Sequence, residues 1–358
     1  MKKTSYFDRG ISVLVTIIII TLGVSTTGAT LQVCKIGCDF SSINRALNES
    51  NPEDTIKIQN GNYSENLRID KEVTLIGTNS RWVRIIPSNP GSPAVIVGPS
   101  PSEVEINNIT VIGEGDRPRS GITVTGGSRL TLKNSTVSNF QTALAARDSS
   151  YLKVRGSEVI NSGTGVLGSG NSELVLSGAR ITSSQKGLIG TNSTEVTVVD
   201  SEVTNCTSNS LLAINTAKIN VLSSSITNNR APGVTLKDFS RLNMEETQVS
   251  SNQSGGILLT NSAIANLTDN LITYNEGKNV SVISKKCGFS GPTDLFFGKV
   301  NGADNEIKPT DSKTICPTKF SKITSSGGGS YSYPFKPSTY VFIGLIGAAS
   351  LYFLVSNF

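Results

Sequence analysis

The sequence predicts an all-β fold, namely a right-handed parallel β-helix of about ten coils with three short strands in each coil. Seven successive segments of about 22 residues, running from Leu130 to about Ser284, repeat the same apolar, glycine and asparagine positions. Such self-similarity is typical of stacked repeats, in which one unit needs its neighbours to bury its apolar face. Each segment holds three short apolar stretches without a helical period or a hairpin signal. An antiparallel sandwich also has turns at roughly 8 to 12 residues, but it has no reason to repeat at about 22.

The first strand of each segment is marked by apolar residues at positions 1 and 3, which alternate with polar ones. Aligned on position 1, the segments begin at Leu130, Leu152, Leu174, Val196, Ile219, Leu242 and Ile264. Position 8 is again apolar and ends a second short strand. Position 10 is short and polar in every segment: Asn139, Asn161, Ser183, Asn205, Asn228, Ser251 and Thr273. We expect these side chains to stack as an inward ladder that satisfies backbone groups at the turn.

A third strand follows, in which a small residue precedes an inward aliphatic one. The inward residues are Leu144, Val166, Leu188, Leu211, Val234 and Ile257. The next positions would then point outward: Ala145, Leu167, Ile189, Leu212, Thr235 and Leu258. An exposed apolar stripe of this kind predicts an interaction surface and lateral self-association. The alternative is that the third strand curves or is covered by a turn.

Upstream of Leu130 the same pattern is looser and is preceded by a short helix over 40–48. Irregular coils open at Ile56, Val73 and Val104. The apolar residues of the helix fall on one face and are Ile43, Ala46 and Leu47. This face suits a helix that covers the first coil.

The chain resembles the right-handed parallel β-helix repeat proteins of the pectin-lyase-like type, nearest to the carbohydrate-binding and periplasmic copper-binding β-helix group. The sequence pattern with which the β-helix of that family begins is matched here by four segments: CDFSSINRAL (38–47), DTI (54–56), GNYSEN (61–66) and VTLIG (73–77). The resemblance extends from about Val33 to Ser284. It implies a solenoid capped by the short helix, and it is specific for fold rather than for function.

The two ends of the chain predict export and anchoring. Basic residues, an apolar run and a small-residue site ending at Ala29 indicate a signal peptide, with an uncleaved membrane anchor as the alternative. The stretch 339–355 is apolar throughout and near the lower limit for crossing a bilayer. Exchange of this tail for a lipid anchor is a minor alternative. The expected location is the cell surface, as a single-pass type I protein on the extracellular side of the plasma membrane.

The expected domain order has six parts. They are a signal peptide (1–29), an N-terminal cap (30–55), the parallel β-helix (56–284), a C-terminal cap with a disulfide (285–320), a flexible linker (321–338) and a transmembrane helix (339–355).

Five cysteines in an exported chain indicate disulfides, which we expect to cross-link the segments at each end of the solenoid. Cys34 lies near Cys38 before the first coil, and Cys287 is expected with Cys316 after the last. A metal site at the first pair is disfavoured, because the chain has no histidine and no further ligands nearby. Cys206 is left over and is expected to be buried.

Asn-x-Ser/Thr sequons are frequent and predict a glycoprotein. The glycosylation candidates are Asn62, Asn108, Asn134, Asn192 and Asn252. Two further sequons, at Asn205 and Asn266, are expected to face inward and to stay unmodified.

Composition excludes several chemistries. The formal net charge is +5, but no basic stripe is interleaved with aromatic residues, so nucleic-acid binding is not expected. The absence of histidine excludes a Ser-His or Cys-His nucleophile, a histidine base and the copper site of the related group. We therefore expect no metal and no cofactor.

The remaining chemistry is that of a polysaccharide lyase, which needs a basic residue and often calcium. The outward positions of the first strands carry Glu105, Asn107, Lys133, Lys153 and Arg155, and an insertion nearby in sequence carries Asp116, Arg117 and Arg119. Lys133, Lys153 or Arg155 would serve as the base, and the other five residues are candidates for binding an acidic sugar. Ordinary solvated charges are the simpler interpretation, and the insertion follows the second strand, which places it on another face.

Paired carboxylates of a glycoside hydrolase are not indicated. Glu158 and Glu202 share a face but are two coils apart with Arg180 between them, so an ion-pair ladder is expected. The sequence thus favours a membrane-anchored extracellular protein without catalysis, structural or carbohydrate-binding, whose partner is a carbohydrate or a cell-surface protein. A polysaccharide lyase or related sugar-active enzyme, with calcium, is the alternative.

Overall fold

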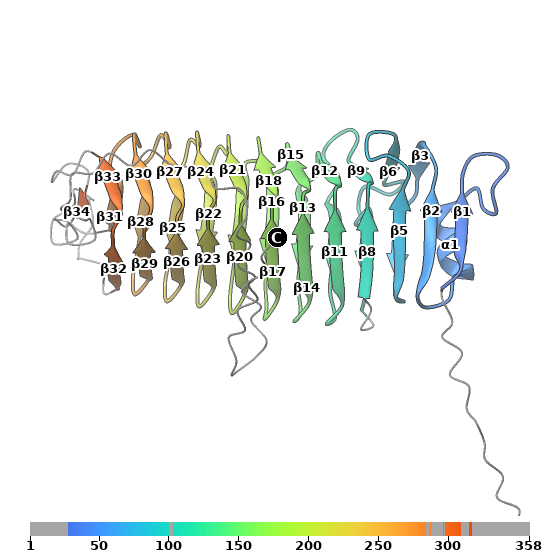
Figure 1. Ribbon diagram of the computed structural model, residues 1–358, viewed down its shortest axis with the longest axis horizontal. Coiled ribbons are helices and arrows are strands. Elements are labelled where there is room, and N and C mark those ends of the chain that lie inside the picture. Colours follow the sequence, from blue (N-terminus) through green and yellow to red (C-terminus); the bar gives the residue numbers. More distant parts are fainter. Residues whose placement is uncertain are drawn as a thin grey trace, which may run out of the picture. The chain divides into compact units, whose positions relative to one another are not determined.

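The computed structural model describes residues 28–99, 103–283, 287, 296, 298–308 and 315–316, and within them it contains a right-handed solenoid of three parallel sheets (Figure 1). The first 27 residues of the predicted signal peptide, the linker and the predicted span at 339–355 lie outside the described residues. No helix within the described part of the chain is long and apolar enough to cross a membrane.

Apart from the first coil, which contributes only β1 to sheet A, every coil contributes one strand to each sheet, and all neighbouring strands are parallel. Sheet A consists of β1 (Thr30–Val33), β2 (Asp54–Ile58), β5 (Val73–Gly77), β8 (Glu103–Asn107), β11 (Arg129–Lys133), β14 (Tyr151–Arg155), β17 (Glu173–Ser177), β20 (Glu195–Val199), β23 (Lys218–Leu222), β26 (Arg241–Glu245), β29 (Ile264–Thr268) and β32 (Lys299–Ala303). Sheet B consists of β3 (Gly61–Ser64), β6 (Val83–Ile86), β9 (Thr110–Ile112), β12 (Thr136–Ser138), β15 (Glu158–Ile160), β18 (Arg180–Thr182), β21 (Glu202–Thr204), β24 (Ser225–Thr227), β27 (Gln248–Ser250), β30 (Leu271–Thr273) and β33 (Glu306–Lys308). Sheet C consists of β4 (Leu67–Ile69), β7 (Val95–Val97), β10 (Ser120–Val124), β13 (Thr142–Ala146), β16 (Thr164–Gly168), β19 (Lys186–Gly190), β22 (Asn209–Ala213), β25 (Val234–Leu236), β28 (Ile257–Leu259), β31 (Val280–Val282) and β34 (Ile315–Cys316).

The solenoid has about eleven turns, one more than the sequence predicts. The two segments expected to be caps account for the difference, because β1 pairs with β2 and the strands β32 to β34 extend all three sheets. The capping helix itself is confirmed: α1 spans Ile43–Glu49 and buries Ile43, Ala46 and Leu47. Its first turn begins at Ser42, whose hydroxyl accepts a hydrogen bond from the backbone N–H of Arg45.

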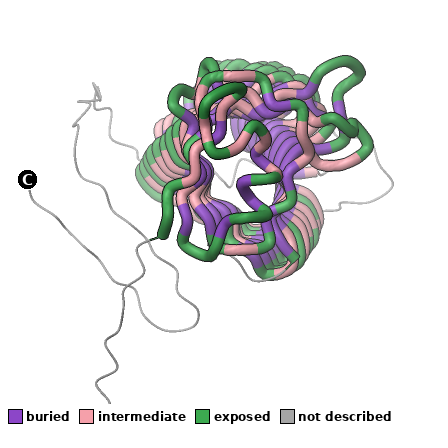
Figure 2. Tube along the Cα trace, turned by 90° about the vertical axis from the view of Figure 1, so that its right-hand side faces the viewer, coloured by how far each residue is buried: buried purple, intermediate pink, exposed green. Residues whose placement is uncertain are grey.

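The interior is formed by the alternating apolar positions of the three strands, which appear as the buried lining of the tube in Figure 2. In β11, for example, Leu130 and Leu132 are fully buried while the residues between and beside them are not. The predicted inward residues of the third strand, from Leu144 to Ile257, are likewise buried. Each large aliphatic side chain buried in this way contributes roughly 1.5–3 kcal/mol relative to an exposed one.

The predicted inward ladder was wrong by one residue. In the first six segments position 10 turns the chain between sheets B and C with φ between 49° and 66°, and these residues are exposed apart from the half-buried Asn139. In the seventh segment Tyr274 makes this turn, with φ of 54°, and Thr273 is buried. Asparagine and serine tolerate this left-handed conformation better than bulky residues do. The residue after each turn points inward: Phe140, Ser162, Ser184, Cys206, Asn229, Asn252 and Asn275.

Asparagine makes the strongest rungs of this ladder. The amide oxygen of Asn252 accepts from the backbone N–H of Asn229 at 3.2 Å and from its Nδ2 at 2.9 Å. The Nδ2 of Asn252 donates to the carbonyl of Ile226 at 3.0 Å and to Oδ1 of Asn275 at 2.9 Å. The side-chain oxygen and nitrogen of Asn252 are therefore paired with both the preceding and the next coil.

The seventh segment is also offset by one residue. Leu242 pairs in register with Ala265 rather than with Ile264, so Ala265 and Leu267 point inward. Asn266 consequently lies on the outer face of sheet A and is exposed, contrary to the predicted inward position.

The cysteines occupy the predicted places. Cys34 is bonded to Cys38 and Cys287 to Cys316, with Cα–Cα distances of 5.6 and 5.5 Å. Cys206 is a buried free thiol in the inward ladder. Burial raises its pKa to about 11, so the thiol stays protonated at neutral pH.

Candidate functional site

The outer face of sheet A collects most of the residues that the sequence suggests for function. Its side chains form three columns along the solenoid, which we number in strand direction. The first column is Glu72, Glu103, Arg129, Tyr151, Glu173, Glu195, Lys218, Arg241, Ile264 and Lys299. The second is Thr74, Glu105, Thr131, Lys153, Val175, Thr197, Asn220, Asn243, Asn266 and Asn301, and the third is Ile76, Asn107, Lys133, Arg155, Ser177, Val199, Leu222, Glu245, Thr268 and Ala303.

The predicted lyase bases lie on this face, but one of them is tied to an acid. Lys133 Nζ lies 2.6 Å from Glu105 Oε2, and both side chains are about one-third exposed. The ion pair occupies the Lys133 ammonium, which would have to leave Glu105 before Lys133 could act on a ligand. Arg155 stands beside Lys133 in the third column and is exposed.

The insertion does not join these residues. Arg117 Nη2 donates to Asn161 Oδ1 at 2.9 Å, at the turn between sheets B and C. Asp116 and Arg119 belong to the same loop, which connects β9 to β10. Glu105 and Asn107 belong to sheet A, whereas the loop leaves from the far end of a strand of sheet B. The residues predicted to bind an acidic sugar therefore lie on two different sides of the solenoid.

A shallow acidic hollow lies at the N-terminal end of the same face. It has a volume of about 300 Å³ and is lined by Glu53, Glu72, Glu103, Glu105 and two threonines. No three potential metal ligands come together within the described residues. The hollow was missed in the sequence because its acids belong to the irregular first coils.

An asparagine ladder occupies the C-terminal half of the second column. Asn243 donates to Asn220, Asn266 to Asn243 and Asn301 to Asn266, at 2.8, 2.8 and 2.7 Å. Beside it the first column carries Lys218, Arg241 and Lys299. The misplaced seventh segment concealed this ladder, although asparagine recurs at the middle of four successive first strands.

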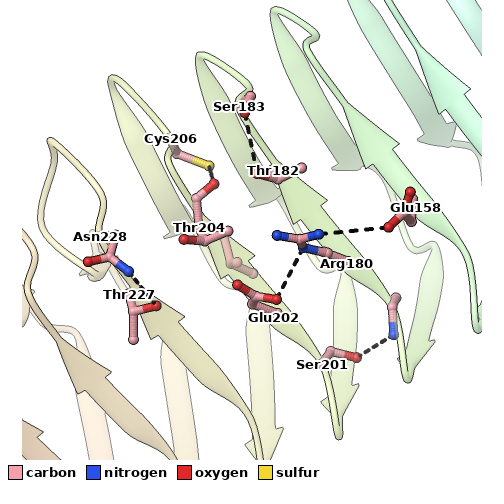
Figure 3. Close-up of polar contacts among 12 residues, drawn as sticks. Glu158, Arg180, Thr182, Ser183, Ser201, Glu202, Thr204, Cys206, Thr227 and Asn228 are labelled. Atoms are coloured by element: carbon pink, nitrogen blue, oxygen red, sulfur yellow. Dashed lines mark hydrogen bonds and ion pairs between the residues drawn. The ribbon is translucent and has the colours of Figure 1, made fainter.

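Sheet B carries the ion-pair ladder that the sequence predicts. Arg180 lies between the two glutamates, with its Nη1 at 3.9 Å from Glu158 Oε1 and its Nε at 3.2 Å from Glu202 Oε2 (Figure 3). All three side chains are between 40 and 49% exposed, so each pair contributes little more than a few tenths of a kcal/mol. Opposite charges alternate here from coil to coil.

The predicted apolar stripe on sheet C is not an exposed patch. Ala145, Ile189 and Leu212 are 1, 7 and 6% exposed, and Leu167 and Leu258 are half-buried. Each residue lies in register between those of the adjacent coils, about 4.8 Å away, so the column covers much of its own surface. The self-association predicted through this stripe therefore loses its basis.

The corrected register changes which sequons the folded protein exposes. Asn252 is fully buried, and its amide is hydrogen-bonded on both sides, whereas Asn205 is exposed at a turn. Asn62, Asn134 and Asn192 are also exposed, and Asn108 is half-buried.

We expect glycosylation at Asn205 and none at Asn252, the reverse of the assignment made from the sequence. A glycan on Asn252 would remove its bond to Ile226 and prevent closure of the coil. The measurement is glycopeptide mass mapping of the exported chain from a glycosylating host, with exposed Asn192 as the reference site. Occupied Asn252 in folded protein would contradict the assigned register.

Comparisons with known proteins agree with this architecture. The model of the right-handed beta helix region matches residues 70–182 and 147–290. Alginate lyase from Paenibacillus sp. str. FPU-7 superposes with a TM-score of 0.54 at 12% identity, covering 76% of this chain and 99% of that one. The catalytic domain of a GH87 alpha-1,3-glucanase, solved with tetrasaccharides, gives 0.52 at 9% identity, covering 86% and 70%. None of the curated proteins matches the sequence.

At these identities the solved structures establish the fold alone. The match of the family model covers more than half of the sequence, from residue 70 to residue 290. The chain belongs to the right-handed β-helix family.

Proposed function

We propose that this protein is a membrane-anchored, extracellular β-helix protein that binds carbohydrate without catalysis, through the C-terminal half of the sheet A face. The observation that carries the proposal is the asparagine ladder beside Lys218, Arg241 and Lys299. The two disulfides support an oxidising, extracellular location. The anchor is the apolar stretch 339–355.

The ladder suits sugar hydroxyl groups. A carboxamide has two N–H donors and an oxygen that accepts twice, and each ladder bond uses one donor and one acceptor position. Inner rungs such as Asn243 and Asn266 thus retain a donor and an acceptor for a ligand. Rungs repeat once per coil, at about 4.8 Å, so a linear chain lying along the solenoid meets the same groups repeatedly.

The neighbouring cations favour an acidic sugar. Lys218 and Arg241 are two residues from Asn220 and Asn243 on the same strands, so a carboxylate and a hydroxyl of one sugar ring can be bound together. Catalysis has less support, since Lys133 is held by Glu105 and the arginines of the insertion lie on another side. A polysaccharide lyase remains the alternative function, and the binding experiment also tests it.

Binding is tested by calorimetry on the full chain, purified in detergent, with polygalacturonate, alginate and neutral dextran. We expect the two polyuronates to bind and dextran to bind more weakly. Arg241→Glu should weaken polyuronate binding by about tenfold or more, because it replaces attraction by repulsion. Lys237→Glu is the matched control, since Lys237 is an exposed cation of the preceding turn, outside sheet A.

Equal binding by Arg241→Glu and the parent chain would contradict the proposed surface. Release of unsaturated uronate products, measured by ultraviolet absorbance with and without calcium, would contradict the absence of catalysis. Loss of those products in Lys153→Ala or Arg155→Ala would then establish the lyase alternative.

A further inference from the structure

The first column of sheet A places like charges directly above one another. Glu173 pairs in register with Glu195, and Lys218 with Arg241. Glu72 directly precedes β5 and so neighbours Glu103 of β8 in the same way. Like charges at such positions are destabilising. Sheet B shows the opposite arrangement, because Arg180 separates its two glutamates there.

These charges are not neutralised within the described part of the chain. None of the six forms an ion pair within 4.0 Å of a described residue. The pKa of Glu173 is raised by burial and by the nearby charge of Glu195, and only Arg129 lowers it. The column thus carries blocks of charge that an opposing surface of reversed sign would stabilise.

The order of the charges is that of a surface complementary to itself. Along the solenoid the column reads Glu72, Glu103, Arg129, Tyr151, Glu173, Glu195, Lys218 and Arg241. When the column is set against a second copy of itself in the reverse order, an acid faces a base at three positions. At the fourth position Tyr151 faces Glu173. We infer that two copies of this chain associate face to face through sheet A, about a twofold axis that is parallel to the strands and passes between β14 and β17.

This operation sets each column of one copy against the same column of the other. In the first column it pairs Glu72 with Arg241, Glu103 with Lys218, Arg129 with Glu195 and Tyr151 with Glu173. In the second it pairs Thr74 with Asn243, Glu105 with Asn220, Thr131 with Thr197 and Lys153 with Val175. In the third it pairs Ile76 with Glu245, Asn107 with Leu222, Lys133 with Val199 and Arg155 with Ser177. No like charges face each other in any column, and every pair occurs twice in the dimer.

Other positions of the axis lose this match. With the axis on β17, Glu173 faces its own copy and Arg129 faces Lys218. With the axis on β14, Glu103 faces Glu195. Since like-charge contacts disfavour wrong arrangements, the charges specify one register.

The contact is extended but modest in area. Eight strands at about 4.8 Å and three columns of side chains bury on the order of 1,000–1,500 Å² in total, the size of a weak interface. The association should therefore depend on concentration and weaken as salt is added. A polyuronate bound at Lys218 and Arg241 would compete with it.

Charge exchange at one pair, away from the proposed sugar site, tests the inference. Sedimentation equilibrium of the full chain in detergent should show a monomer–dimer equilibrium at low salt. Arg129→Glu and Glu195→Arg should each weaken the dimer by about tenfold or more, and the double exchange should restore it. Arg180→Glu on sheet B is the matched control and should leave the dimer unchanged.

Cross-linking tests the register. A chain with Thr131→Cys and Thr197→Cys should give a covalent dimer with a short bismaleimide, because these residues face each other between copies and lie three coils apart within one copy. Thr74→Cys with Thr197→Cys should not. A chain that stays monomeric at low salt, a double exchange that fails to restore the dimer, or equal cross-linking of both cysteine pairs would overturn the inference.

Discussion

Asn252→Ala is expected to lower the free energy of unfolding by about 3–5 kcal/mol, a large effect for the loss of one carboxamide. The substitution removes the acceptor of the backbone N–H and of the Nδ2 of Asn229, and one donor to the carbonyl of Ile226, at a fully buried turn. The Oδ1 of Asn275 loses a donor as well. Each buried polar group left without a partner costs about 1–3 kcal/mol.

The measurement is the midpoint of urea unfolding of the full chain, followed by circular dichroism. Gln253→Ala is the matched control, because Gln253 is the next residue and is exposed. Asn252→Ser should retain part of the stability, since Ser184 fills the same rung elsewhere. A loss below about 1 kcal/mol in Asn252→Ala would show that the ladder does not stabilise the coil.

Gly187→Ala is expected to destabilise the protein by about 2–4 kcal/mol through steric conflict rather than through lost bonds. A Cβ at Gly187 would meet the backbone oxygen of Ser210 in the next coil, Cγ1 of Val203 at 2.8 Å and Sγ of Cys206 at 3.0 Å. Two of these neighbours are buried core residues that have little room to move.

The same strand provides the control. A Cβ at Gly190 would lie 3.4 Å from Val196 and 3.5 Å from Ala217, which is ordinary contact. Ala213 also occupies the equivalent place in the next coil. Gly190→Ala should therefore be neutral or slightly stabilising in urea unfolding. Similar midpoints for the two variants would show that the coil can widen at Gly187.

The repeat was sufficient to predict the architecture. Leu130, Leu132 and their equivalents recur at a fixed spacing, and only a parallel solenoid brings such residues together without helices. The capping helix followed from one apolar face, and the disulfides followed from the positions of the cysteines.

The register at the turns could not be predicted in the same way. An exposed residue with positive φ and an inward ladder residue both favour asparagine or serine, so Asn228 and Asn229 are equivalent by composition. At the seventh segment Ile264 and Ala265 both satisfy the apolar pattern, and only pairing with Leu242 decides between them. With the register taken from Ile264, the sequence places Asn266 inside the solenoid rather than on its outer face.

The candidate site was predicted in part for a related reason. Alternation along β11 and β14 places Lys133 and Arg155 on the outer face of sheet A, as expected. Proximity in sequence does not place Arg117 there, because its loop leaves a strand of another sheet. The groups of like charge in the first column of sheet A could not be predicted from a single coil either, because their members come from successive coils and become neighbours only when the coils are stacked.

Stacking also constrains how the length of such a chain can evolve. Because Asn229 bonds to the equivalent residue of the next coil, deletion of one whole coil would join two compatible rungs, whereas a shorter deletion within the strands would leave the ladder unmatched. Within the strands and the ladder turns, the core thus tolerates changes of length only in units of one turn, whereas loops such as the one between β9 and β10 can vary in length. The face of sheet A is stricter, since a lost turn between Glu72 and Arg241 would shift every opposing charge by about 4.8 Å. Among relatives that keep this charge order, we therefore expect variation in coil number to lie outside that segment.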